Sequence, residues 1–160
     1  MIKDTIRFGL LILLGLWFLL SLSPHNSEAA IIKRSRLTVT ATGEDGSATG
    51  SDTTDEVIQG QVVRVDIDYD GTLTTTTDLT LSESDDLIAT NVINRSNSVT
   101  DASVFPTVGL TNNAGTAVTY DGTRPIVDYY PVVGKLTASL AQTTAATPAV
   151  TIDIYWREDK

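Results

Sequence analysis

The amino-acid sequence predicts an all-β protein, an antiparallel two-sheet sandwich of Greek-key or jelly-roll type with about seven to nine strands, preceded by an N-terminal hydrophobic helix. Three observations lead to this fold class. Beyond residue 36, short runs alternate apolar and polar residues, and turn signals recur about every 8–12 residues. Threonine, valine, alanine and glycine dominate this part of the chain. A helical period is absent from the sequence after the N-terminal segment.

The longest alternating run extends from Gln61 to Gly71 and predicts a half-buried strand. Its polar residues, Arg64, Asp66 and Asp68, are expected to face solvent. The Asp70-Gly71 pair is a turn signal that ends the strand. Four side chains are expected to point into the core: Val63, Val65, Ile67 and Tyr69.

Shorter runs predict the remaining strands. The segment 43–55 is rich in Gly, Ser, Thr and Asp without periodicity, and it predicts a loop or a flexible edge. Pro106 is expected on an edge or at a bulge, because proline has no ladder donor. Trp156 in the last strand and Tyr69 are predicted core residues. Further strands are expected at 37–42, 78–81, 87–93, 104–108, 117–120, 126–130, 135–140 and 150–157.

The chain divides into three parts on this interpretation. Residues 1–30 form a hydrophobic membrane anchor or signal peptide, residues 31–36 a basic linker, and residues 37–160 the β-sandwich domain. A domain of this length can bury one core.

The N-terminal segment has an apolar run from Phe8 to Leu22, about 22 Å long as a helix against roughly 30 Å of bilayer hydrocarbon. Its length leaves open an uncleaved anchor, a signal peptide cut before Ala30, and a buried core helix. The first two alternatives send the domain to or across a membrane. The residues expected to contact the membrane are Phe8, Leu11, Leu14, Trp17, Phe18 and Leu20.

The charge of the chain limits its partners. With 11 Lys plus Arg and 20 Asp plus Glu, the net charge of −9 repels nucleic acid, so no nucleic-acid role is expected. The basic cluster Lys33, Arg34 and Arg36 follows the apolar segment and is a candidate contact for lipid head groups. A solvated linker is the alternative for these three residues.

A short acidic motif, Asp66-x-Asp68-x-Asp70-Gly71, matches the start of a calcium-binding loop, in which alternate carboxylates surround a hard cation. The match then fails, because Thr77 occupies the twelfth position, where such a loop has glutamate. The favoured interpretation is that Asp66 and Asp68 lie on the solvent side of a strand. Calcium is therefore only a candidate, and no other cofactor is expected.

The chain offers few residues for catalysis. It has no cysteine, and its one histidine, His25, precedes the domain, so the usual nucleophile–base pairs cannot be assembled. Pairs of carboxylates remain open, as in glycosidases, but a solvated acidic surface is the simpler interpretation. We therefore expect no enzyme.

Five runs, 58–69, 77–81, 129–131, 133–136 and 150–155, lie within about residues 37–157. In their order and spacing they resemble small β-sandwich virion proteins of phages. The resemblance lies in strand order and spacing, without a catalytic signature, and implies a structural role on or between capsid subunits. The N-terminal apolar segment departs from that pattern and would fit a virus with a membrane.

The resulting expectation is a non-enzymatic structural protein, a membrane-anchored or capsid-associated minor virion protein located in a virion, at a membrane or outside the cell. Its partners would be other structural proteins or further copies of itself, and membrane lipid through the N-terminal helix. The contact surface would be the segment 43–55 or an edge strand. The alternatives are a secreted or cell-surface binding module or adhesin, and an extracellular filament subunit.

Overall fold

The computed structural model describes residues 30–84 and 90–158, and within these ranges the chain forms ten β-strands and no helix. The strands are β1 (Ile32–Ala41), β2 (Ala48–Thr53), β3 (Ile58–Tyr69), β4 (Asp78–Glu83), β5 (Asn91–Arg95), β6 (Ala102–Val104), β7 (Thr107–Gly109), β8 (Val127–Gly134), β9 (Leu136–Thr143) and β10 (Ala146–Glu158).

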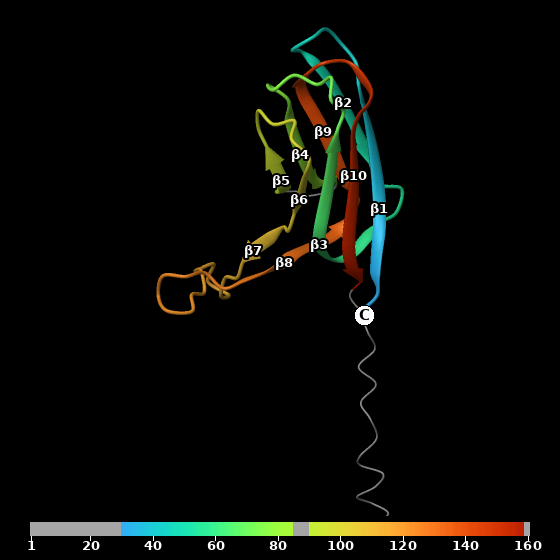
Figure 1. Cartoon of the computed structure of the whole chain (residues 1–160). Coiled ribbons are helices and arrows are strands. Elements are labelled where there is room, and N and C mark those ends of the chain that lie inside the picture. Colours follow the sequence, from blue (N-terminus) through green and yellow to red (C-terminus); the bar gives the residue numbers. More distant parts are fainter. Residues whose placement is uncertain (1–29, 85–89, 159–160) are drawn as a thin grey trace, which may run out of the picture.

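Two antiparallel sheets face each other (Figure 1). One follows the order β1-β10-β3-β8-β7, and the other follows β2-β9-β4-β5. Strands β8 and β6 share one edge of β3: β8 pairs with Ile58–Val62, and β6 pairs with Val65–Ile67. The predicted all-β fold with two antiparallel sheets is confirmed, with ten strands in place of seven to nine.

One hydrophobic cluster fills the space between the sheets. The alternation predicted for the last strand is confirmed, since Val150, Ile152, Ile154 and Trp156 are all buried. The Trp156 indole also donates a hydrogen bond of 3.0 Å from Nε1 to Ser35 Oγ, which satisfies its buried polar atom. Tyr69 is buried as well. Both rings predicted for the core therefore lie there.

The segment 43–55, predicted as a loop or an edge, contains strand β2. Its edge position is confirmed, because β2 is the outermost strand of the second sheet, next to β9. The loop alternative is wrong for Ala48–Thr53. The sequence shows no apolar alternation here because Ala48 is the only buried apolar residue of this strand.

The segment 31–36, predicted as a basic linker, is mostly part of a strand in the structure. Strand β1 begins at Ile32, which pairs with Arg157 of β10, so most of the segment belongs to the sheet. Polar side chains on this stretch reflect its place at the sheet edge, where charged residues discourage pairing with other strands.

A β-bulge changes the predicted pattern of β3. Opposite β10, Tyr155 pairs with Arg64 but Trp156 pairs with Val62, so Val63 is an extra residue. Val62 is fully buried, whereas Val63 is only partly buried. The prediction that Val63 points into the core is therefore wrong, while Val65, Ile67 and Tyr69 are buried as expected.

An arm, defined here as residues 105–129, projects from one end of the sandwich (Figure 1). Thr107 pairs with Tyr129 at its root, where β7 meets β8. Farther out, backbone hydrogen bonds connect Leu110, Val118 and Ile126 to one another, with N···O distances of 2.8–3.0 Å. The turns predicted at 112–115 and 121–122 both lie in the arm.

The predicted N-terminal hydrophobic helix lies outside the described residues, as do all six residues expected to contact the membrane. Within residues 30–84 and 90–158, no helix is long and apolar enough to cross a membrane.

Candidate functional site

The outer face of the larger sheet presents two different surfaces. It is built from the residues of β1, β10 and β3 that point away from the core, because strand residues alternate between faces. One half carries the acidic groove, with Asp66, Asp68 and Asp153. The other half, next to the root of the arm, carries the apolar groove, with Ile32 and Tyr155. The two halves suit different partners and are described in turn.

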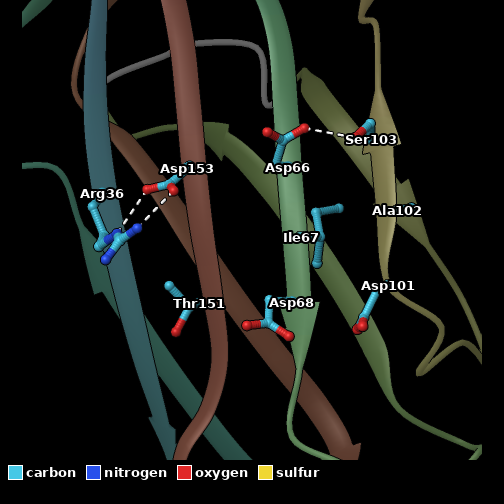
Figure 2. Close-up of a pocket in the computed structure, with 9 residues that line it drawn as sticks. All are labelled: Arg36, Asp66, Ile67, Asp68, Asp101, Ala102, Ser103, Thr151 and Asp153. Atoms are coloured by element: carbon cyan, nitrogen blue, oxygen red, sulfur yellow. Dashed lines mark hydrogen bonds and ion pairs between the residues drawn. The ribbon is translucent and has the colours of Figure 1, made fainter.

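The acidic groove has a volume of about 380 Å³ and lies between β1, β10, β3 and β6 (Figure 2). Arg36 donates two hydrogen bonds of 2.7 Å to Asp153, one from Nε to Oδ1 and one from Nη2 to Oδ2. Ser103 Oγ donates one of 2.7 Å to Asp66 Oδ1, which joins β6 to β3. Asp101 Oδ1 accepts a hydrogen bond of 2.9 Å from the Tyr69 backbone N–H.

The charge state of Asp153 follows from this geometry. Hydrogen bonding and attraction from Arg36 hold the pKa of the Asp153 carboxyl below its usual range, although partial burial opposes the shift. The same hydrogen bonds raise the pKa of Arg36. Asp153 is therefore ionised at neutral pH, and both of its carboxylate oxygens accept hydrogen bonds from the Arg36 guanidinium. A carboxylate in this state is poorly suited to act as a general acid.

The three carboxylates of the calcium candidate do not form one site. Asp66 binds Ser103 and lies 3.0 Å from Arg64, from Oδ2 to Nη2. Asp68 is exposed on the outer side of β3. Asp70 lies beyond the strand and accepts hydrogen bonds from the Thr72 N–H and hydroxyl, which lower the pKa of the Asp70 carboxyl. Within the described ranges, no three acidic or histidine side chains are grouped to hold a metal ion.

The favoured alternative, a solvent-facing strand that ends in a turn, describes these three residues. Asp66 and Asp68 belong to β3, and Asp70 follows its last residue, Tyr69. Asp70 accepts two hydrogen bonds from a residue two positions later, as Asp does in a local turn.

The basic cluster predicted to contact lipid head groups is paired with carboxylates of the domain. Lys33 Nζ lies 2.6 Å from Glu158 Oε1 and 5.0 Å from the centre of the Trp156 ring. Arg36 binds Asp153, and Arg34 lies 3.8 Å from the same carboxylate. All three side chains are nevertheless about half exposed. Their contact with lipid stays a prediction.

The apolar groove is the surface that the sequence did not reveal. It has a volume of about 280 Å³ and is lined by Ile32, Val63, Arg64, Phe105, Tyr129 and Tyr155. The bulge in β3 places Val63 and Arg64 side by side on the outer face, and Arg64 stacks 4.2 Å from the centre of the Tyr155 ring. On the arm side, Arg157 lies 5.9 Å from the centre of the Tyr129 ring.

The arm exposes an unusual share of large apolar side chains. Of the eleven such residues exposed in the described part of the chain, seven lie in the arm, and Tyr120 near its tip is 81% exposed. The other four are Ile32 on β1, Val133 on β8, and Ile31 and Val57, which directly precede β1 and β3. Those in the arm are Phe105, Val108, Leu110, Tyr120, Ile126, Val127 and Tyr129.

Sequence reasoning identified part of the arm but not its role. It predicted the compact hairpin around 117–120, and the turns have the expected chemistry: Asn112 Oδ1 accepts bonds from Ala114 N–H and Thr116 N–H, and Asp121 Oδ1 from Thr123 N–H and Arg124 N–H. The exposure was not foreseen because alternation alone does not tell which strands have a sheet to cover them.

Carboxylates, arginine and apolar rings set the chemistry of the two grooves and the arm. The domain has no cysteine or histidine to act as nucleophile or base. The apolar groove and the arm combine aromatic rings and arginine, the side chains that are enriched where proteins contact one another.

Comparisons with known proteins place the chain in no family. No protein-family model matches it, and no curated protein does. Among solved structures, one similar chain belongs to the virus-like particle of the extra small virus of the giant freshwater prawn Macrobrachium rosenbergii. The likeness covers 87% of this chain and 86% of that chain, at 10% identity and a TM-score of 0.29, which is too low to carry an argument about function.

Proposed function

We propose that this protein is a non-enzymatic structural subunit that acts through protein–protein contacts in a repeating assembly. The observation that carries the proposal is the projecting arm, which holds seven of the eleven exposed large apolar side chains of the described residues. Exposed apolar patches of several hundred Å² on a soluble domain mark interaction surfaces. An arm that is too thin to bury these side chains itself needs another protein to cover them.

The strand order supports a scaffold role. If β6, β7 and β8 are counted together as the sixth strand, β9 becomes the seventh and β10 the eighth. The larger sheet then has the strand order 1-8-3-6 and the smaller sheet 2-7-4-5, which is the arrangement of a jelly roll built from two Greek keys. Jelly rolls occur in viral capsid domains, and also in lectins and cupins. The fold alone therefore does not decide the function, and the proposal rests on the arm.

The form of assembly favoured here is a virus particle, with the chain as a membrane-anchored or capsid-associated minor component. This finer part of the proposal rests on the sequence resemblance to virion β-sandwich proteins and on the apolar run at 8–22. A binding module that recognises a ligand through the acidic groove is the alternative class. It would require a ligand for Asp66, Asp68 and Asp101, whereas Asp153 is already bound by Arg36.

Sedimentation velocity of the full chain in a mild detergent tests the proposal. We expect oligomers whose size grows with protein concentration. Tyr120→Ser should shift the chain toward monomer, because it removes the most exposed aromatic ring of the arm.

Val133→Ser is the matched control, because Val133 is 79% exposed and lies on β8 outside the arm. It should leave the distribution unchanged. A monomer at all accessible concentrations would contradict the proposal, and so would equal effects of the two substitutions.

A further inference from the structure

We propose that the arm of one copy of this chain docks into the apolar groove of a second copy, so that the copies associate head to tail. The inference rests on the proposed function and deepens it, because it names the partner of the arm. Its basis is that one chain carries both a projecting apolar arm and an apolar groove, and that the two cannot meet within one molecule.

The arm cannot fill its own groove. Phe105 and Tyr129, at the root of the arm, form one wall of the groove. The tip extends away from the sandwich (Figure 1), and hydrogen bonds between Leu110, Val118 and Ile126 hold the arm extended. Bending the tip back to its own root would break these bonds. The groove is therefore open to the arm of another molecule.

The amount of exposed surface is suited to a stable contact. Phe105 and Tyr129 line the groove itself, so the other five exposed apolar residues of the arm are left to enter a second copy. With roughly 150–250 Å² for a large side chain, these five expose on the order of 400 Å². A standard interface takes about 800 Å² from each partner. The arm thus supplies about half of one side of such an interface.

The groove has the size and chemistry of an anchor site. Its volume of about 280 Å³ lies below the range of roughly 300–1,000 Å³ typical of pockets for small molecules, so it suits one or two side chains. Tyr155 and Tyr129 line the groove with aromatic rings, and Arg64 is stacked on the Tyr155 ring. Tyr120, 81% exposed near the tip of the arm, is the side chain that would fill it.

The charges at the tip and at the groove permit a second copy in this orientation. The chain has a net charge of −9, so two copies repel unless their contact avoids acidic surface. Arg64 and Arg157 border the apolar groove. At the tip of the arm, Arg124 Nε lies 3.3 Å from Asp121 Oδ2, so the tip brings no net negative charge into the groove.

The natural chain has no cysteine, which permits a cross-linking test without background. Two full-length versions with different tags are mixed in detergent: Thr123→Cys, beside Tyr120 at the tip, and Thr107→Cys, which pairs with Tyr129 at the groove. Both positions are exposed, and both substitutions keep Tyr120 and the groove residues. A short bismaleimide should join the two versions in a mixed dimer.

Two control mixtures make the result specific. Thr123→Cys with Asp45→Cys, in the turn between β1 and β2, should give at least tenfold less mixed dimer, because Asp45 lies far from the groove along the sheet. Thr123→Cys with itself tests a contact between two arms. Adding Tyr120→Ser to the Thr123→Cys version should raise the protein concentration needed for half-maximal cross-linking by about 30-fold, as expected for an aromatic hot spot.

The outcomes separate this inference from the proposed function. If Thr123→Cys joins itself faster than it joins Thr107→Cys, the arms pair with each other, and the head-to-tail contact is wrong while self-assembly holds. If the chain forms oligomers but gives no cross-link through Thr123→Cys, another surface or another protein covers the arm, and the inference is again overturned. A chain that stays monomeric and uncross-linked overturns both.

Discussion

The sandwich and the arm are both made of short antiparallel strands, yet the sandwich buries its apolar side chains and the arm exposes them. In the sandwich, two sheets bury residues such as Trp156 and Leu81 almost completely. In the arm, no second layer covers Leu110 or Tyr120, and both remain exposed. Strands need a facing layer to gain from burial. The stability of the chain should therefore depend on the sandwich, and its associations on the arm.

The largest effect on stability is expected from Trp156→Ala. The side chain is 3% exposed and bonded to Ser35, so its removal leaves a cavity and should lower the free energy of unfolding by about 3–5 kcal/mol. Urea unfolding followed by circular dichroism measures this value. Tyr120→Ala should change it by no more than about 0.5 kcal/mol. A loss of 2 kcal/mol or more at Tyr120 would show that the arm is packed, and the comparison would break.

A second effect concerns the close packing of the sheet backbone. A Cβ built on Gly60 would lie 1.9 Å from the Arg157 carbonyl oxygen of the neighbouring strand, so Gly60→Ala forces the backbones apart. We expect a loss of about 1–3 kcal/mol, the usual cost of overpacking. Gly71→Ala is the control, because no atom lies within 4 Å of the Cβ that it adds. Equal unfolding curves for the two variants would contradict the predicted crowding.

A smaller, pH-dependent effect is expected at the ion pair of the acidic groove. Because Arg36 lowers the pKa of Asp153, this carboxylate contributes stability above its unfolded pKa of about 3.9, and the contribution is lost as the pH falls through the lower pKa of the folded state. Asp153→Asn should therefore unfold more easily than the natural chain at pH 7, and the difference should vanish in strong acid. Asp68→Asn removes an exposed carboxylate that does not bind Arg36. Its stability relative to the natural chain should not depend on pH in this way. A difference that persists in strong acid would exclude the ion pair as its cause.

The smallest effect is expected from calcium. Asp66, Asp68 and Asp70 do not converge, so neither calcium nor a chelator should change the melting temperature of the natural chain. Differential scanning fluorimetry with 1 mM magnesium as the comparison ion provides the measurement. A calcium-specific rise in melting temperature that Asp68→Asn removes would restore the metal site and give the acidic groove a role in binding.

The sequence predicted the strands correctly where one face of the strand is buried in the core and the other faces solvent. The alternation of Val150 to Trp156 gave the correct buried face without error. It failed for β2, whose only buried apolar residue is Ala48, and for the start of β1, where charged residues hid a sheet edge. In both places the backbone ladder, and not the side-chain pattern, defines the strand.

The candidate site was harder to predict than the fold. The acidic motif at 66–71 was visible in the sequence, but Ser103, the partner of Asp66, comes from another strand, and Asp70 is bound locally by Thr72. The apolar groove joins residues from β1, β3, β10 and the arm, which only the sheet order brings together. A useful signal was present in residues 105–129, where apolar side chains are interrupted by two Asx turns and two prolines.

The extra residue in β3 has a consequence for how such a surface can arise. Without Val63, Val62 would still face inward and Arg64 outward, so the ladder with β10 would become regular and the core would be unchanged. The interior therefore does not require Val63, whereas the apolar groove loses part of its floor. A single codon gained or lost at this point would therefore reshape the apolar groove without changing which residues of β3 face the core.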